Sequence, residues 1–160
     1  MRLGSPRASR QRSASNSFCI TVDQRRVLAG ESWSQGQVLL AWDEVKRGAG
    51  TPGDGHNVVI HEFAHQLDAE SGRTNGAPEL HTARQYKQWS QLMQTHYDAM
   101  QVALSRGEDT FLDPYAATAP AEFFAVLSET FYEQPVGLQK AHPALYAELK
   151  AFYRVHPASW

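Results

Sequence analysis

The sequence predicts a mainly α fold with a small β component. Four stretches carry apolar side chains at spacings of three and four residues, the repeat of a helix that buries one face. A short apolar run at residues 37–42, preceded by Gly36, is instead typical of a buried strand. With 160 residues, 42% of them hydrophobic, the chain is long enough for one domain with a sizeable core and too short for two.

The first predicted helix follows a glycine-rich loop. Residues 48–55 contain four glycines and one proline, a composition that favours turns. We expect the helix to begin after Asn57, a suitable N-cap, and to continue to about Glu70, because Gly72 then ends it. Its apolar positions are Val58, Ile60, Phe63, Ala64 and Leu67.

Three further helices are expected after a polar loop at residues 71–80. The third helix begins at Pro120, since proline suits the first helical position, and stops near Pro135. The fourth runs from about Pro143 until Pro157 breaks it. The second has the most regular apolar stripe, formed by Tyr86, Trp89, Met93, Tyr97, Met100 and Leu104.

Charge and composition exclude several classes of protein. Four arginines precede the first acid, Asp23, so the rest of the chain carries 11 Lys and Arg against 17 Asp and Glu. This balance argues against a nucleic-acid partner. No apolar run approaches the roughly 20 residues of a membrane-spanning helix, so no membrane partner is expected. One cysteine, Cys19, cannot form an internal disulfide, and we expect a cytoplasmic protein.

Residues 1–17 differ in composition from the rest of the chain. They are rich in Arg and Ser and lack the apolar stretch of a secretory signal. We therefore expect a disordered tail over residues 1–17 and a single domain over residues 18–160.

The residues that carry chemistry lie in the first predicted helix. The segment His61-Glu62-Phe63-Ala64-His65 fits the pattern HExxH, whose two histidines lie on one helix face and can bind one Zn²⁺. Glu62 lies beside them, where its carboxylate can take a proton from a water activated by the metal. The alternative is a helix that holds these three residues by chance.

A catalytic zinc site needs a third protein ligand and an open position for water. Glu122 and Glu129 lie seven residues apart on the third predicted helix, hence on roughly one face. The pattern leaves both open, with Glu122 slightly ahead because it lies at the helix start beside Phe123 and Phe124. His56 is too close in sequence to reach around the metal easily. The scattered histidines are expected on surfaces or helix faces: His81, His96, His142 and His156.

Two longer motifs resemble a known family. Residues 59–68 and 113–129, together with residues 152–154, resemble the Mlc titration factor A family, and the resemblance extends from Arg26 to the end of the chain. These are bacterial zinc-dependent peptidases whose core is similar to the protease domain of anthrax lethal factor. The resemblance implies a zincin-like metallopeptidase core with HExxH on a helix and a glutamate ligand on a later helix. The family has a further N-terminal portion, which we expect to be absent here.

Residue by residue, the resemblance implies a complete catalytic set. His61 and His65 match zinc ligands, and Glu122 matches the third ligand. Glu62 matches the general base. Tyr115 matches a tyrosine that hydrogen-bonds the oxyanion of the tetrahedral intermediate, with ordinary loop packing as the alternative.

Three nearby residues have alternative roles. Asp68 is placed either to hold a ligand imidazole by its other ring nitrogen or to lie at the helix surface. Glu129 is expected either to support the site as a neighbouring acid or to be exposed to solvent. Ala119 stands where a capping Asp or Ser is expected, at a cost of about 1 kcal/mol of helix stability.

The expected function is that of a zinc-dependent peptidase, of aminopeptidase type, with one Zn²⁺ per chain and a peptide as substrate. The alternative is a regulatory binding module, because the family takes its name from sequestering the repressor Mlc and a repressor of that type is an implied partner. A structural zinc site is disfavoured, since such sites usually have four protein ligands, commonly cysteines, and Cys19 stands alone.

Overall fold

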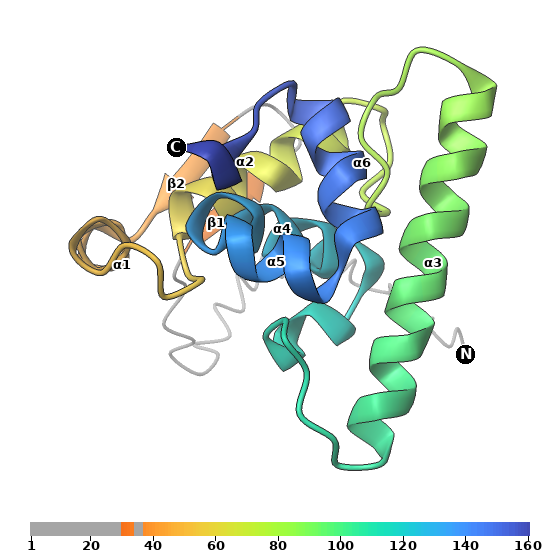
Figure 1. Ribbon diagram of the computed structural model, residues 1–160. Helices are drawn as coiled ribbons and strands as arrows, with labels where there is room; N and C mark the ends of the chain where they lie inside the picture. The colour runs from red at the N-terminus through yellow and green to blue at the C-terminus, as the bar shows by residue number, and fades with distance from the viewer. Residues whose placement is uncertain (1–29, 34–36) are drawn as a thin grey trace, which may run out of the picture.

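A computed structural model describes residues 30–33 and 37–160 of the chain (Figure 1). Within them, β1 (Gly30–Trp33) pairs antiparallel with β2 (Gln37–Leu40), with Gly30 opposite Leu40. The predicted strand is thus confirmed in its first four residues. The tail expected at residues 1–17 lies outside the described residues and stays a prediction, as does the extent of the domain.

The mainly helical prediction is confirmed. The four predicted helices correspond to α2 (Val58–Ala69), α3 (Ala83–Ser105), α4 (Pro120–Glu133) and α6 (Pro143–Tyr153). Elements that the apolar pattern did not predict are α1 (Trp42–Gly50), α5 (Pro135–Ala141) and the 3₁₀ turns η1 (Pro114–Ala117) and η2 (Pro157–Ser159). Across the described residues, no helix is both long enough and apolar enough to cross a membrane.

The loop prediction for residues 48–55 is wrong at its start. Residues 48–50 form the last turn of α1, a short helix with no buried residue, in which Gly48 and Gly50 conceal the helical spacing of Trp42, Val45 and Ala49. Ion pairs between Asp43 and Lys46 (2.7 Å) and between Glu44 and Arg47 (2.9 Å) lie along its surface. Such exposed pairs each add only about 0.3–0.5 kcal/mol.

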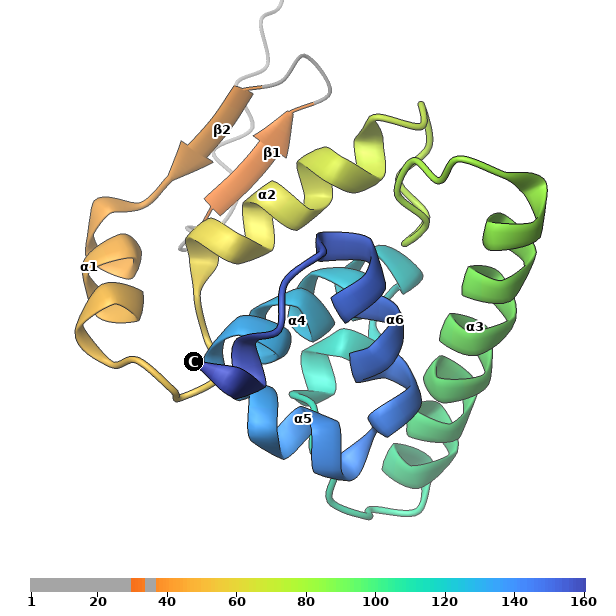
Figure 2. The ribbon, with the colours of Figure 1, turned by 45° about the horizontal axis from the view of Figure 1, so that its top comes forward.

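Helix α4 occupies the centre of the core. Nine consecutive residues, 123–131, are buried, so the helix is covered on every side. Figure 2 shows α2 on one side of it and α5 and α6 on the other. Its N-cap, Ala119, makes no side-chain capping bond, as expected, and Pro120 fills the first position. Burial of the whole helix outweighs the roughly 1 kcal/mol lost with that cap.

The loop between α2 and α3 is held against the start of α4. Asp68, fully buried, accepts hydrogen bonds from the backbone N–H groups of Gly76 (2.8 Å) and Ala77 (2.9 Å). Gly76 has φ +77°, and a Cβ there would lie 2.4 Å from the carbonyl oxygen of Pro120. The indole N–H of Trp89 donates to the Gly76 carbonyl at 2.8 Å. Both alternatives for Asp68 are therefore wrong, because its carboxylate neither contacts an imidazole nor faces solvent.

Candidate metal centre

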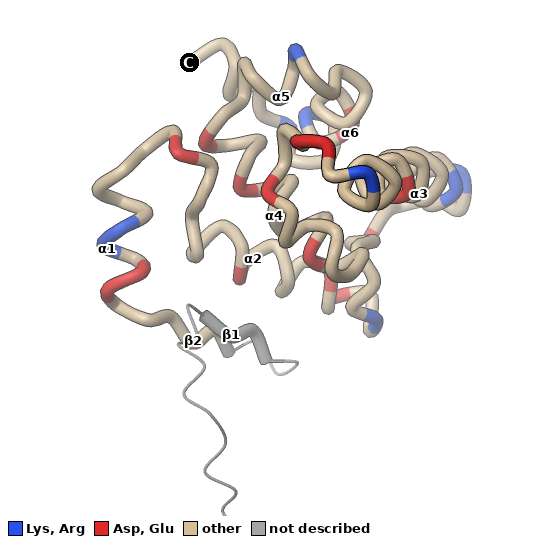
Figure 3. The backbone as a smooth tube through the Cα atoms, turned by 90° about the horizontal axis from the view of Figure 1, so that it is seen from below, with Lys and Arg blue, Asp and Glu red and all other residues tan. Residues whose placement is uncertain are grey.

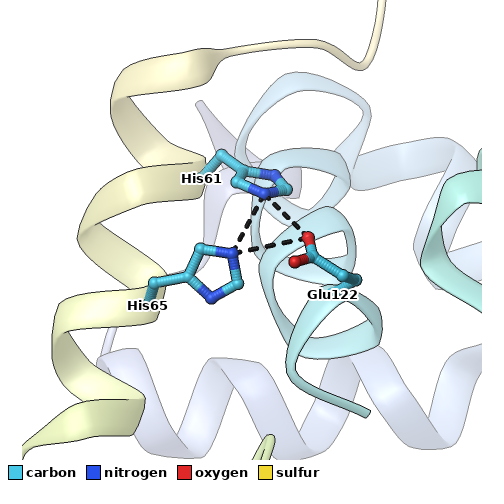
Figure 4. A group of neighbouring side chains, drawn as sticks. All are labelled: His61, His65 and Glu122. Carbon is cyan, nitrogen blue, oxygen red and sulfur yellow. Dashed lines mark hydrogen bonds and ion pairs between the residues drawn. The ribbon is translucent and has the colours of Figure 1, made fainter. Parts of the chain in front are cut away.

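Three side chains from α2 and α4 converge on one point (Figure 4). His61 Nε2 lies 3.1 Å from Glu122 Oε2 and 3.2 Å from His65 Nε2, and the His65–Glu122 distance is 3.4 Å. Ligand atoms at 2.0–2.1 Å from a tetrahedral Zn²⁺ lie about 3.3 Å from one another. The donor set and its spacing therefore fit a metal ion without rearrangement.

The two histidines come together because α2 is a regular helix. Residues four apart lie one above the other on the same face, and the rings meet edge to face with centroids 4.8 Å apart. The side chain of Asn57 caps the helix by accepting from the Ile60 N–H at 3.3 Å. Glu122 reaches the same point from the first turn of α4, which packs against α2.

Glu129 does not belong to this group of three. Its Oε2 accepts the Nδ1–H of His61 at 3.0 Å, so it contacts the ring from the side away from Glu122. Its Oε1 accepts the backbone N–H of Asn57 at 2.8 Å. A carboxylate in this place fixes which ring nitrogen of His61 is free to bind a metal.

His65 has no equivalent support. Among the described residues, no hydrogen-bond partner reaches its buried Nδ1. The two imidazoles therefore differ, because only His61 has its tautomer set by a protein acceptor.

The carboxylates change the protonation of the site. Burial lowers the pKa of His61, but hydrogen bonds to Glu122 and Glu129 together outweigh burial and raise it from 6.5 to about 9. Burial raises the pKa of Glu122, while hydrogen bonds from His61 and His65 together lower it from 4.5 to about 2. A metal ion bound at His61 Nε2 at neutral pH would therefore have to displace a proton.

Two members of the group, His61 and Glu122, open onto a cleft of about 1030 Å³. Glu62 and Tyr115 line this cleft together with His61 and Glu122. Glu62 is 6% exposed, whereas Tyr115 is 52% exposed and its ring centroid lies 6.2 Å from that of His61. Asp113 positions the tyrosine, because its carboxylate accepts the Tyr115 N–H at 2.7 Å and caps η1.

A set of contacts that the sequence did not reveal holds the loop before α2. Glu133 accepts the N–H of Gly53 at 2.7 Å and the side-chain amide of Asn57 at 2.9 Å. The side-chain amide of Gln134 donates to the Gly53 carbonyl at 3.0 Å. The signal that could have revealed this is the spacing of Glu122, Glu129 and Glu133 along one face of an otherwise apolar helix.

The surroundings of the site are acidic. Helices α2 and α4 carry five Asp and Glu and, within their bounds, no Lys or Arg. Figure 3 shows these red positions along both helices, while blue positions lie on α1, α3, α5 and α6. A cation is therefore favoured over an anion at the meeting point of α2 and α4.

Comparison with known proteins agrees with this geometry. The profile of the family described as glucose-regulated metallo-peptidase M90 matches residues 6–154. The chain belongs to this family. Membership in M90 agrees with a group of His and Glu side chains that can hold a metal ion.

Relatives of this M90 chain are bacterial. An uncharacterized protein of Synechocystis, slr2042, is 41% identical over 86% of this chain and 50% of its own length. Proteins named Mlc titration factor A from Pectobacterium atrosepticum and Escherichia fergusonii are 41% and 36% identical, over 83% and 88% of this chain. These matches cover 50% and 53% of the two relatives, so the chain spans about half the length of the curated relatives it matches. The resemblance to the Mlc titration factor A family is confirmed.

Proposed function

We propose that this chain is a zinc-dependent peptidase with a zincin-like core. The observation that carries the proposal is the triangle of His61, His65 and Glu122 donor atoms, 3.1–3.4 Å apart. Two of these residues, His61 and Glu122, line one cleft with Glu62 and Tyr115. One Zn²⁺ per chain suits two imidazoles and one carboxylate, the ligand types of catalytic zinc sites with an open position. When bound, zinc supplies Lewis-acid chemistry that makes water acidic near pH 7 and polarises a carbonyl.

Glu62 is the general base of the proposed reaction. It takes a proton from the attacking water and returns it to the nitrogen of the leaving amine. Its position on α2, one residue after His61, keeps its carboxylate on the wall of the cleft. Because it is nearly buried, its carboxylate acts in a less polar environment than bulk water.

Tyr115 donates its phenol hydrogen to the carbonyl oxygen as negative charge develops there. Asp113 holds the backbone of Tyr115, and the turn η1, which contains Tyr115, packs against α4, which carries Glu122. Glu129 keeps the Nδ1–H of His61 occupied, so that Nε2 is the nitrogen presented to the metal.

An aminopeptidase is the type of peptidase that we favour. It requires an acidic side chain in reach of a substrate ammonium group. Besides Glu62 and Glu122, the cleft is lined by Glu44, Asp54, Asp113 and Glu129, of which Asp113 and Glu129 hydrogen-bond directly to Tyr115 and His61. Glu129 is 6% exposed and already accepts two hydrogen bonds, whereas the Asp113 side chain is 39% exposed. Asp113 is therefore the proposed partner of the ammonium group.

The test combines zinc analysis with hydrolysis of an unblocked and an N-acetylated peptide. We expect Glu122→Ala to lose zinc, and Glu62→Gln to keep zinc while turnover falls by about 10²–10⁴. Glu70→Gln, the same change at the exposed end of α2, serves as the control and retains both. A folded wild-type chain that stays metal-free in the presence of added zinc refutes the proposal. Equal cleavage of the acetylated peptide refutes the aminopeptidase type.

Regulation is the second candidate function, because two of the relatives bear the name Mlc titration factor A. We propose that a transcription repressor of the Mlc type is a partner and that the protein works in the cytoplasm. A binding assay with the purified repressor and Glu62→Gln separates the two functions. If Glu62→Gln still binds the repressor but no longer hydrolyses peptides, the two functions depend on different parts of the molecule. If neither the wild type nor Glu62→Gln binds the repressor, the regulatory function is refuted.

A further inference from the structure

A second cavity, of about 230 Å³, lies apart from the metal cleft. Helix α3, the segment 109–112, the start of α4 and the junction of α5 and α6 line it, a region that can be followed in Figure 1, and it opens to solvent beside Ala99, Asp109 and Phe111. No residue lines both this cavity and the metal cleft. It therefore needs an explanation of its own.

The wall of this cavity is mainly apolar. Met100, Leu112, Phe123 and Leu145 line it, and all four are buried. Phe111 is 40% exposed and packs on Gly137, where a Cβ would lie 2.7 Å from the tip of the phenyl ring. An apolar wall with an aromatic ring at its edge is the surface that apolar ligands prefer.

Two imidazoles supply the polar part of the wall. His96 from α3 and His142 from the α5–α6 junction meet edge to face, with centroids 5.5 Å apart. Burial lowers the pKa of His96, and burial together with the proximity of His96 lowers the pKa of His142. Both rings are therefore neutral at pH 7, and each offers one donor and one acceptor. Among the described residues, neither ring has a hydrogen-bond partner of its own.

We propose that this cavity is a second ligand site, which takes a neutral aromatic molecule of about the size of indole. A cavity of about 150 Å³ holds benzene, so a cavity of 230 Å³ has room for two fused rings. The free imidazole nitrogens of His96 and His142 match one polar N–H or O–H on the ligand. A full charge is disfavoured by the apolar wall, and Asp109 in the lining repels an anion.

The probes are indole and indole-2-carboxylate, titrated into the full chain and followed by the imidazole C–H signals of the histidines in NMR spectra. These signals locate the ligand better than backbone amides, because Leu112 and Phe123 adjoin Asp113 and Glu122 of the metal cleft. We expect indole to saturate below about 1 mM, with the largest changes at His96 and His142. The carboxylate is expected to bind at least about tenfold more weakly.

Ala103→Phe fills the cavity and is expected to weaken indole binding at least about tenfold. Ala147→Phe, the same change at an exposed position of α6 outside the lining, is the control and leaves binding unchanged. If Ala103→Phe does not fold, as judged by circular dichroism, Ala99→Phe repeats the test from the same helix. Absence of saturable indole binding, changes centred on His61, or full binding by a folded cavity-filling variant overturns the proposal. Equal affinity for the carboxylate overturns the ligand class.

Discussion

Replacing Glu129 by glutamine tests how the metal centre is held. The carboxylate accepts from His61 Nδ1 at 3.0 Å and from Asn57 N at 2.8 Å, and glutamine keeps only one acceptor oxygen. One buried donor then faces an NH₂ group, which costs about 1–3 kcal/mol of folding free energy. Loss of such support for a ligand typically weakens metal binding by about 10–100-fold, or about 1.4–2.7 kcal/mol.

The proton on His61 makes the expected loss of zinc affinity depend on pH. Glu129 is one of the two carboxylates that raise the pKa of His61 to about 9, so its removal also makes the proton a weaker competitor for Nε2. The loss of zinc affinity is therefore expected to be smaller at pH 6 than at pH 9. Competition with a chromophoric chelator at both pH values gives the dissociation constants directly.

Glu133→Gln provides the matched control. Glu133 lies one turn further along α4 and accepts from Gly53 and Asn57, but it contacts neither histidine. We expect its zinc affinity to stay within about threefold of the wild type. Wild-type affinity in Glu129→Gln refutes the reasoning, and an equal loss in both variants assigns the effect to the loop before α2 rather than to His61.

Three further predictions concern other parts of the molecule. Tyr115→Phe is expected to lower kcat by about 100-fold or more, while the zinc content, measured by elemental analysis, stays at the wild-type level. A loss of zinc in this variant would instead make Tyr115 a structural residue. Gly76→Ala is expected to lower the free energy of unfolding, measured in urea, by about 3 kcal/mol, because the new Cβ would lie 2.4 Å from the Pro120 carbonyl oxygen. Gly72→Ala is the control: Gly72 has a similar φ but open space around it, so the expected loss is only about 1 kcal/mol. Because the folded-state pKa values of His96 and His142 lie below 6.5, their contribution to stability is present above pH 6.5 and is lost as the pH falls through the lowered pKa values. Urea unfolding between pH 7 and pH 5 measures this loss; His142→Gln is expected to reduce it, and an unchanged pH dependence contradicts the assignment.

The sequence predicted those helices whose buried faces repeat regularly. The apolar stripe of α3 and the proline at the start of α4 made both helices recognisable. Helix α1 buries no residue, and α5 begins at Pro135, which the sequence indicates only as a stop. Helix α5 buries Leu138 through tertiary packing that no local pattern records, whereas the glycines at the end of α1 favour a loop in the sequence.

The site was predictable where its geometry is local. The spacing of His61 and His65 within α2 brings them together without any other element. Glu122 and Glu129 share a helix face, so only the packing of α4 on α2 determines which of them meets the Nε2 atom of His61. Asp68 also shares a face with His61 by spacing, yet two backbone donors of the following loop bind its carboxylate.

The pairing of α2 with α4 also bears on how the protein is made. His61 and Glu122 are 61 residues apart, so at about 5–20 residues per second the ribosome needs about 3–12 s to add Glu122 after His61. During that interval the nascent chain has only two of the three proposed ligands, the imidazoles of α2, and it still lacks the helix against which α2 packs. For the proposed site we therefore expect metal loading to follow the docking of α4, in contrast to zinc fingers, whose folding the metal itself drives.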